Sequence, residues 1–442
     1  MRFKVFKNTV LLFVVVAISC AGKGGSKKLE DGSEKTEDTS TALSVTEKND
    51  VKKIIVGANR NEVYLPLLKG KRVGVVANQT SVIFKREIPV KIEPPKSLSG
   101  QHKPLESHII LNQHIVDSLL ALNINIKKVF SPEHGFRGTA DAGENVKDGV
   151  DVKTQLPIFS LHGKHKKPTA EQLEDLDIMI FDIQDVGVRF YTYISTLHYV
   201  MEACAENNVK LLILDRPNPN GNYVDGPTLE KEHSSFLGMH TIPLVHGMTI
   251  GEYAKMINGE GWLKNNAKCD ITVVEMEHYN HKNTYSLPIR PSPNLPNDQS
   301  ITLYPSLGLF EGTNINAGRG TEFQFQRYGA PFLDASHYTF TYTPQPNFGS
   351  KNPKHKDVLC YGEDLSKIKA ERRFTLKYVI DAYNNATDKS KVFNIANFTK
   401  HAGTEKLQQQ IEAGMSEEDI RATWKEDLET FKAIRAKYLI YD

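Results

Sequence analysis

Cysteine is scarce in this chain, with four residues among 442. Beyond Cys20 near the N-terminus, Cys204, Cys269 and Cys360 are far apart and lack the spacing of a metal site. This pattern argues against a disulfide framework and against a zinc site made of cysteines. It favours buried thiols that act as small apolar side chains.

An excess of charge of either sign is also absent. The chain has 55 Lys and Arg against 53 Asp and Glu, which gives a net charge of +2. We therefore expect no nucleic-acid partner. With 39% hydrophobic and 24% charged residues, the composition is that of a globular protein, and the length suggests two domains.

Several signature motifs are missing. The first apolar strand leads into "ANQTSVIFKR" without a Gly-x-Gly-x-x-Gly sequence, and Gly-x-Ser-x-Gly, Walker A and His-Glu-x-x-His are absent as well. His162, His165 and His246 lie in polar stretches and do not cluster at ligand spacing. We expect no cofactor and no required metal.

The N-terminus has the pattern of an export signal. "MRFKVFK" is basic, and "TVLLFVVVAIS" is apolar but short for a membrane span. Cys20 follows in "AISC", which resembles a bacterial lipobox, so residues 1–20 predict a lipoprotein signal with Cys20 as the lipidated residue. An ordinary signal peptide with a stray cysteine is the alternative. Residues 21–52 are polar and predict a disordered tether.

A lipidated protein of this kind would be located in the cell envelope, either in the periplasm or at the outer membrane. It would contact the membrane only through the lipid anchor.

Four apolar runs follow, each continuous rather than alternating, as in strands covered on both faces. They occupy residues 71–78, 126–134, 177–185 and 209–217. Helical periodicity at residues 112–123 and 193–208 separates them. The alternation of strands and helices predicts an open, Rossmann-like parallel α/β sheet at residues 53–289.

Each apolar run ends in polar side chains. In an open parallel sheet a ligand binds beyond the carboxyl ends of the strands, so we expect these side chains to converge. The alternative is that they are solvated starts of loops. The residues concerned are Asn78, Gln79, Glu133, His134, Asp182, Gln184, Asp185, Asp215 and Arg216.

The amino-acid composition changes at "RPSPNLPNDQS", which is rich in proline and in turn-forming residues. We place a domain boundary at residue 290, with a smaller α+β domain over residues 290–442. The last segment, residues 416–442, repeats apolar positions at helical spacing, and Trp424 within it is interpreted as a core residue.

Five motifs occur in order along the chain: "SPEHGFRG" (131–138), "DIQDVGVRFYTY" (182–193), "DRPNP" (215–219), "RPSPNLP" (290–296) and "LFEGTNINAGRGT" (309–321). Together they resemble the NamZ family of exo-β-N-acetylmuramidases, which take part in peptidoglycan recycling. The resemblance begins near residue 71 and continues to the C-terminus.

The resemblance implies a Rossmann-like domain, a smaller α+β domain and an active site in the cleft between them. It also implies release of N-acetylmuramic acid from the non-reducing end of peptidoglycan fragments, with Glu133 as the catalytic glutamate. Residues 82–107 form a longer connection than the family pattern, and this insertion could border the cleft.

Glycosidic cleavage needs a proton donor and, in the usual scheme, a second carboxylate. We predict Glu133 as the acid, with its pKa raised by partial burial; the alternative is a loop carboxylate paired with Arg137 or His134. Asp182, Asp185 and Glu311 are candidates for the second carboxylate. If the 2-acetamido group of the substrate attacks instead, no enzymic nucleophile is needed.

An arginine could bind the lactyl carboxylate of muramic acid through two hydrogen bonds. The alternative is that the arginine forms an ion pair with a carboxylate inside the cleft. Asparagines could bind hydroxyls or the acetamide, and tyrosines could stack on a sugar face. The candidate binding residues are Asn78, His134, Arg137, Gln184, Arg189, Tyr191, Tyr193, Arg216, Asn294, Glu311, Asn314 and Arg319.

A rival hypothesis is a peptidoglycan-binding lipoprotein that has lost catalysis, which would not need Glu133. A hydrolase of esters or amides is a third reading, but the chain lacks its nucleophile signature.

Overall fold

The computed structural model of the chain describes residues 52–92, 105–138, 144 and 147–442. Residues 52–442 form one compact unit. The signal sequence, Cys20 and the tether predicted above lie outside the described residues. The domain boundary placed at residue 290 stays a prediction. We call residues 52–289 the first part of the chain and residues 290–442 the second part.

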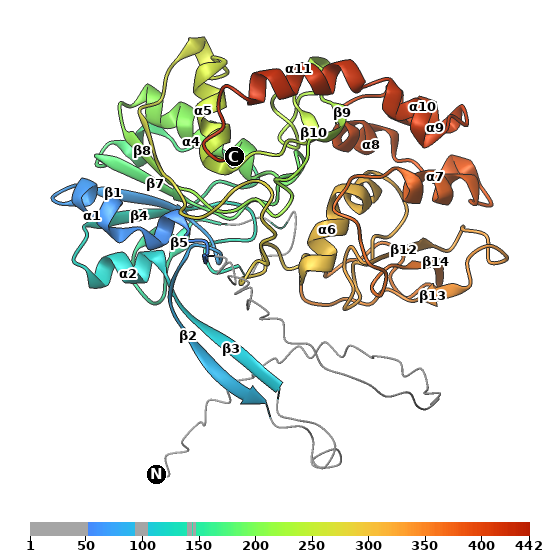
Figure 1. Cartoon of the computed structure of the whole chain (residues 1–442), viewed down its shortest axis with the longest axis horizontal. Coiled ribbons are helices and arrows are strands. Elements are labelled where there is room, and N and C mark those ends of the chain that lie inside the picture. Colours follow the sequence, from blue (N-terminus) through green and yellow to red (C-terminus); the bar gives the residue numbers. More distant parts are fainter. Residues whose placement is uncertain (1–51, 93–104, 139–143, 145–146) are drawn as a thin grey trace, which may run out of the picture. The chain divides into compact units, whose positions relative to one another are not determined.

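A seven-stranded sheet forms the centre of the first part of the chain (Figure 1). Its order is β11–β8–β7–β1–β4–β6–β5, in which only the edge strand β5 is antiparallel to its neighbour. The six parallel strands follow the Rossmann order. The bounds are Val73–Ala77 (β1), Ile126–Ser131 (β4), Gly149–Val150 (β5), Pro157–Ser160 (β6), Ile178–Asp182 (β7), Lys210–Leu214 (β8) and Ile271–Val274 (β11).

The four apolar runs of the sequence are β1, β4, β7 and β8, and they lie side by side in the sheet. Strand order reverses at β1, between β4 on one side and β7 on the other. The carboxyl ends of these strands therefore meet at the topological switch point, where ligands bind in folds of this type. The predicted Rossmann-like parallel sheet is confirmed.

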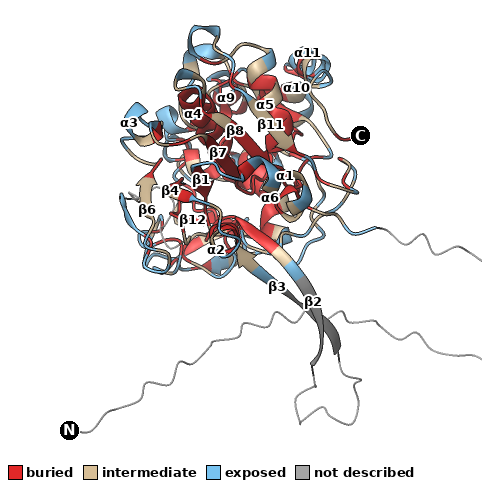
Figure 2. Ribbon diagram, turned by 90° about the vertical axis from the view of Figure 1, so that its left-hand side faces the viewer, coloured by how far each residue is buried: buried red, intermediate tan, exposed pale blue. Residues whose placement is uncertain are grey.

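Successive residues of the strands pack on opposite faces of the sheet. Val76, Phe181 and Ile213 belong to the core that includes the helices on one face, whereas Ile180 and Leu212 belong to the core on the other. Because both faces are covered, the strands are continuously apolar, and Figure 2 shows the sheet as the most buried layer.

Helices cover both faces of this sheet. Tyr64 and Leu119 from α1 and α2 pack on one face, while Leu197 and Ile257 from α4 and α5 pack on the other. Helix α5 begins with a capping box between Thr249 and the Glu252 backbone and side chain. The bounds are Asn61–Leu68 (α1), Ile115–Ala121 (α2), Ala170–Leu173 (α3), Tyr193–Glu206 (α4) and Ile250–Gly259 (α5).

The helix predicted at residues 112–123 begins later than expected. Residues up to His114 belong to β3, and the His114 side chain caps α2 by accepting the Val116 N–H at 3.3 Å. The predicted insertion at residues 82–107 corresponds to an antiparallel hairpin of β2 (Val82–Ile92) and β3 (Leu105–His114). Residues 93–104 of the insertion lie outside the described residues.

The second part of the chain contains a small antiparallel sheet in the order β12–β14–β13, surrounded by helices. This arrangement confirms the predicted α+β character of the region. The bounds are Asp298–Leu307 (α6), Arg327–Ala330 (β12), Phe340–Tyr342 (β13), Cys360–Asp364 (β14), Lys377–Asn384 (α7), Ile395–Ala402 (α8), Lys406–Glu412 (α9), Glu417–Ala422 (α10) and Lys425–Arg435 (α11).

The predicted C-terminal helix is divided at Trp424, which ends the connection from α10 and precedes α11. Trp424 is 5% exposed and lies 6.3 Å from the Phe374 ring, as expected for a core residue. Cys204, Cys269 and Cys360 are free and buried, in agreement with their interpretation as apolar side chains.

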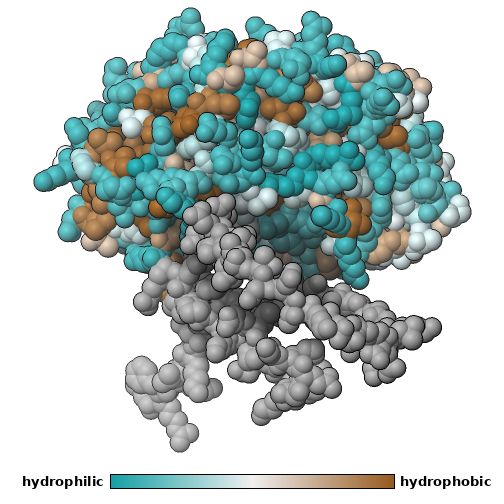
Figure 3. All heavy atoms as spheres, in the orientation of Figure 1, coloured by the Kyte–Doolittle hydropathy of each residue, from teal (hydrophilic) through white to brown (hydrophobic). Residues whose placement is uncertain are grey.

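On the face shown in Figure 3, hydrophilic side chains cover most of the surface, and hydrophobic ones gather mainly over the first part of the chain. Among the described residues, no helix combines the length and the apolar character needed to cross a membrane.

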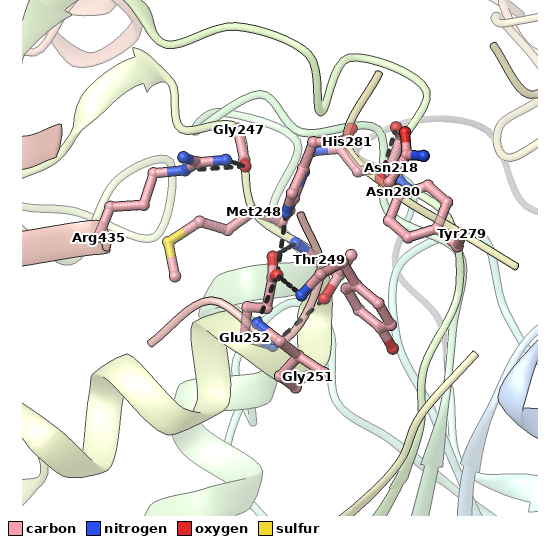
Figure 4. Close-up of polar contacts among 12 residues, drawn as sticks. Asn218, Gly247, Met248, Thr249, Gly251, Glu252, Tyr279, Asn280, His281 and Arg435 are labelled. Atoms are coloured by element: carbon pink, nitrogen blue, oxygen red, sulfur yellow. Dashed lines mark hydrogen bonds and ion pairs between the residues drawn. The ribbon is translucent and has the colours of Figure 1, made fainter. Parts of the chain in front are cut away.

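The C-terminal segment returns to the first part of the fold, where it enters a buried polar network around Glu252 (Figure 4). The Glu252 carboxylate accepts hydrogen bonds from the backbone N–H groups of Thr249, Ile440 and Tyr441, and it pairs with His281 Nε2 at 2.9 Å. This network ties the end of the chain to α5.

Asp215, at the carboxyl end of β8, joins the same network. Its fully buried carboxylate accepts hydrogen bonds from Thr249 Oγ1 at 2.7 Å, the Gly251 N–H at 2.9 Å and the Tyr441 hydroxyl at 2.9 Å. Burial raises the pKa of Asp215 to about 6, although these hydrogen bonds act in the opposite direction.

We expect Asp215 to make folding less favourable as pH rises from about 4 to about 6. Over this interval the unfolded chain loses the Asp215 proton while the folded protein retains it. The free energy of unfolding of the wild type minus that of Asp215→Asn should therefore decrease by about 1–3 kcal/mol.

Urea unfolding at several pH values measures this difference. Asp270→Asn, at an exposed position, is the control and should show no such trend. A wild-type-minus-Asp215→Asn difference that is constant between pH 4 and pH 7 would contradict the prediction.

Candidate active site

A cavity of about 90 Å³ lies beyond the carboxyl end of β4 and receives residues from both parts of the chain. We call it the inner cavity. The first part contributes the turn after β4, the segment that leads into α4, and Leu237, and the second part contributes the remaining wall. The residues are Glu133, His134, Phe190, Tyr191, Thr192, Tyr193, Leu237, Ser292, Asn294, Leu295, Tyr304, Glu311, Arg319, Phe325 and His401.

Glu133 lies on this wall, half-buried, in the turn that follows β4. Its Oε2 atom accepts a hydrogen bond from Thr192 Oγ1 at 3.2 Å, and its backbone carbonyl accepts one from the Tyr193 hydroxyl at 3.4 Å. His134, next in the turn, has a φ of 72° and is 4% exposed. The turn thus places Glu133 beside the start of α4.

Aromatic rings share the wall of the inner cavity with Glu133. The ring of Tyr191 lies 5.0 Å from that of Tyr193 and 5.8 Å from that of Tyr304, with edge-to-face geometry in both pairs. Burial raises the pKa of the Tyr193 phenol, and the Glu133 charge raises it further. Burial likewise raises the pKa of Tyr191 and Tyr304, so the phenols on the wall beside Glu133 stay neutral near pH 7.

Asn294 presents an unsatisfied acceptor on the same wall. The residue is 1% exposed, and its Nδ2 donates to the Gly349 carbonyl at 2.7 Å. Its Oδ1 is buried without a hydrogen-bond partner in the described part of the chain. A buried acceptor in this state favours a ligand that brings a donor.

Glu311 and Arg319 form an ion pair on the wall of the inner cavity. They also line a second cavity of about 460 Å³, which we call the outer cavity. Arg319 is held between two glycines with left-handed backbone, Gly318 at φ 76° and Gly320 at φ 78°. Because Glu311 and Arg319 line both cavities, the pair lies at the border between them.

His401 lines the inner cavity but carries no signal in the sequence, because it follows no strand and lies near the end of α8. It is 8% exposed, and its Nδ1 faces the Asn397 carbonyl at 2.8 Å. Burial lowers the pKa of His401 and favours the neutral imidazole. Thr192 and Tyr304 were likewise missed by the sequence analysis.

Asp182 and Arg216 do not line either cavity. The Asp182 carboxylate is fully buried, and it accepts from Arg216 Nε at 2.6 Å and from Arg216 Nη2 at 3.0 Å. Arg216 also donates to the Val82 carbonyl. Two polar residues at neighbouring strand ends are therefore directed at each other rather than at a substrate.

Three further strand-end residues also make contacts inside the protein. Asp185 accepts the Gly187 N–H at 2.6 Å and lies 3.7 Å from His246 Nε2. Gln184 donates to the Pro217 carbonyl, and Asn78 donates to the Tyr193 hydroxyl at 2.9 Å. None of the three strand-end residues lines the inner cavity, although Asn78 supports a tyrosine that does.

Two of the candidate arginines are occupied elsewhere. Arg137 pairs with Asp151 at 2.8 Å and with Asp117 at 3.4 Å. Arg189 is fully buried and donates to four backbone carbonyls, those of Pro227, Ile242, His401 and Ala402. Of the four arginines proposed to bind an acid, the structure places only Arg319 on the cavity wall.

Asn314 donates to the Lys391 carbonyl at 2.8 Å and lies outside both cavities. One group among the described residues has ligand atoms close enough for a metal ion, namely Glu230, Glu232 and His233. Glu230 already pairs with Lys406 at 2.6 Å, and the group does not line the inner cavity.

Comparison with known proteins agrees with the motifs and the fold. Residues 107–299 match the N-terminal family model of exo-β-N-acetylmuramidase NamZ, and residues 302–441 match the C-terminal one. The chain belongs to the NamZ family.

The peptidoglycan β-N-acetylmuramidase NamZ of Bacillus subtilis (strain 168) is 38% identical over 401 residues, which cover 86% of this chain and 89% of that protein. Two solved structures of DUF1343 family proteins from Bacteroides fragilis are also similar. One is 42% identical with a TM-score of 0.76, and the other is 28% identical with a TM-score of 0.68. Each alignment covers 88% of this chain and 99% of the other.

The Asp182–Arg216 pair predicts a loss of stability when the carboxylate is removed. Asp182→Asn leaves a buried guanidinium without its partner and should cost about 3–5 kcal/mol of unfolding free energy. Asp177→Asn is the matched control, because its ion pair with Arg72 is partly exposed and its loss should therefore cost much less stability. Urea unfolding of both variants tests this expectation; equal losses would contradict it.

Proposed function

We propose that this chain is an exo-acting glycoside hydrolase that releases N-acetylmuramic acid from the non-reducing end of peptidoglycan fragments, with Glu133 as the general acid. Membership of the NamZ family supports the reaction and the substrate class. The half-buried carboxylate of Glu133 on the wall of the inner cavity supports the choice of residue.

In this reaction Glu133 transfers its proton to the oxygen that bridges the two amino sugars. The bond between that oxygen and the anomeric carbon breaks, and the oxygen of a water molecule ends on the anomeric carbon. The proton that this water loses restores the acid over the complete cycle. Neutral phenols and aromatic edges around Glu133 limit the solvation of its charged form.

Glu311 is the candidate for a second carboxylate whose position fits best. Among the described residues, Glu133 and Glu311 are the carboxylates on the inner-cavity wall, whereas Asp182 and Asp185 are engaged within the protein. The buried Oδ1 of Asn294 suits the N–H group of the 2-acetamido substituent. That contact would also hold the acetamide if the acetamide itself attacks the anomeric carbon.

Glu133→Gln tests the assignment. Loss of the proton donor should lower kcat/KM for a chromogenic β-N-acetylmuramide by roughly two to four orders of magnitude. The melting temperature should stay close to that of the wild type, since Gln keeps the acceptor for Thr192. Glu174→Gln, at an exposed position, is the control.

The same experiment separates the rival hypothesis. A binding protein without catalysis would release no chromophore from the muramide in any variant, yet it would bind the free sugar. Activity of Glu133→Gln equal to that of the wild type would refute the role of Glu133 but not the family's reaction.

We also propose that Cys20 carries a lipid that holds the protein in the cell envelope, on the basis of the sequence "AISC". The full-length chain, produced in a bacterium that processes lipoproteins, should partition into the detergent phase of Triton X-114. Cys20→Ser should move it to the aqueous phase. Equal partitioning of both proteins would contradict the anchor.

A further inference from the structure

The outer cavity has no assigned role, although it shares Glu311 and Arg319 with the inner cavity. Its volume of about 460 Å³ compares with about 90 Å³ for the inner cavity. A substrate held in the inner cavity would therefore have a larger space beside it, bordered by the Glu311–Arg319 pair.

Among the described residues that line the outer cavity, one cation has no ion pair with a carboxylate. Arg319 pairs with Glu311, and Lys351 pairs with Glu144 at 2.8 Å. Lys354 has a different environment, because its ammonium lies within hydrogen-bond distance of four backbone carbonyls, those of Phe310 at 2.8 Å, Glu311 at 3.3 Å, Ile315 at 3.4 Å and Thr313.

Lys354 and Arg319 are held in fixed positions on this wall. Asn316 Nδ2 donates to the backbone carbonyls of Arg319 at 3.1 Å and Lys354 at 2.9 Å. Burial lowers the pKa of Lys354 to about 8, and Arg319 lowers it while Glu311 raises it. A carboxylate bound beside Lys354 would stabilise the charged form.

The position of Glu133 determines which part of a substrate can enter the outer cavity. The acid must contact the oxygen between the two sugars, so the subsite for the leaving sugar has to include Glu133 on its wall. Glu133 lines the inner cavity and not the outer one. The outer cavity is therefore suited to a substituent on the sugar ring rather than to the leaving sugar.

We propose that the outer cavity is a carboxylate-binding subsite for the acidic substituent on carbon 3 of N-acetylmuramic acid, with Lys354 and Arg319 as its cations. This inference rests on the proposed muramidase function. The carboxylate has two sources, the lactyl group itself or a peptide attached to it, and the volume of the cavity accommodates either.

Binding of free sugars to the full chain tests the proposal independently of hydrolysis. Isothermal titration gives Kd for N-acetylmuramic acid, for its uncharged lactyl methyl ester, for N-acetylmuramyl-L-alanyl-D-glutamate and for N-acetylglucosamine. We expect the free acid or the peptide to bind at least tenfold more tightly than the ester.

Two variants test the site itself. Lys354→Met removes the cation, and Asn352→Glu adds an anion at an exposed residue of the same wall without altering the contacts of Lys354. Each should reduce the preference for the acid over the ester about tenfold. Asn384→Glu, exposed on α7, is the control with the same change of charge and should keep the preference. Melting temperatures identify a Lys354→Met protein that has not folded, in which case Asn352→Glu decides.

Loss of preference confined to the free acid would assign the site to the lactyl carboxylate, and loss confined to the peptide would assign it to the peptide. An unchanged preference in Asn352→Glu would overturn the proposal. If the preference changes as expected but the wild type does not hydrolyse the muramide, the proposed function fails and the subsite stands. If the wild type hydrolyses the muramide but the preference is unchanged, the subsite proposal fails and the proposed function stands.

Discussion

The guanidinium of Arg189 is the constraint on which the inner cavity depends. It is fully buried and has no carboxylate partner in the part of the chain that the structure describes. It donates to carbonyls of both parts of the chain, Pro227 and Ile242 in the first and His401 and Ala402 in the second. Burial lowers its pKa to about 9. Four backbone acceptors replace the water that a buried charge loses, so the arginine fixes the distance between the two parts.

These hydrogen bonds of Arg189 directly position the wall of the inner cavity. Arg189 immediately precedes the segment Phe190–Tyr193, which lines the inner cavity and leads into α4, and it holds the carbonyl of His401 on the opposite side. The C-terminal segment adds a second tie through Glu252 and Asp215. A cavity formed by two regions of chain needs such ties, because its shape is lost if the regions separate.

The polar groups at the switch point divide into two kinds. Some, such as Asp182 with Arg216, neutralise each other in the interior and support the strand ends. Others, such as Glu133 and Asn294, lie on the wall of the inner cavity, and Asn294 Oδ1 has no hydrogen-bond partner among the described residues. The proposed binding and chemistry rely on residues of the second kind, because they lie on the cavity wall where a ligand can contact them.

The sequence by itself determined the parallel sheet, because continuous apolar runs reflect burial on both faces, and it determined that Glu133 follows the strand β4. It also placed Asn294, Glu311 and Arg319 in motifs of the site. Only the tertiary structure decided that Arg189 would be buried and that His401 would reach the cavity. A strand-end residue is polar whether it meets a partner or a substrate, and the difference lies in which distant chain segment packs against it.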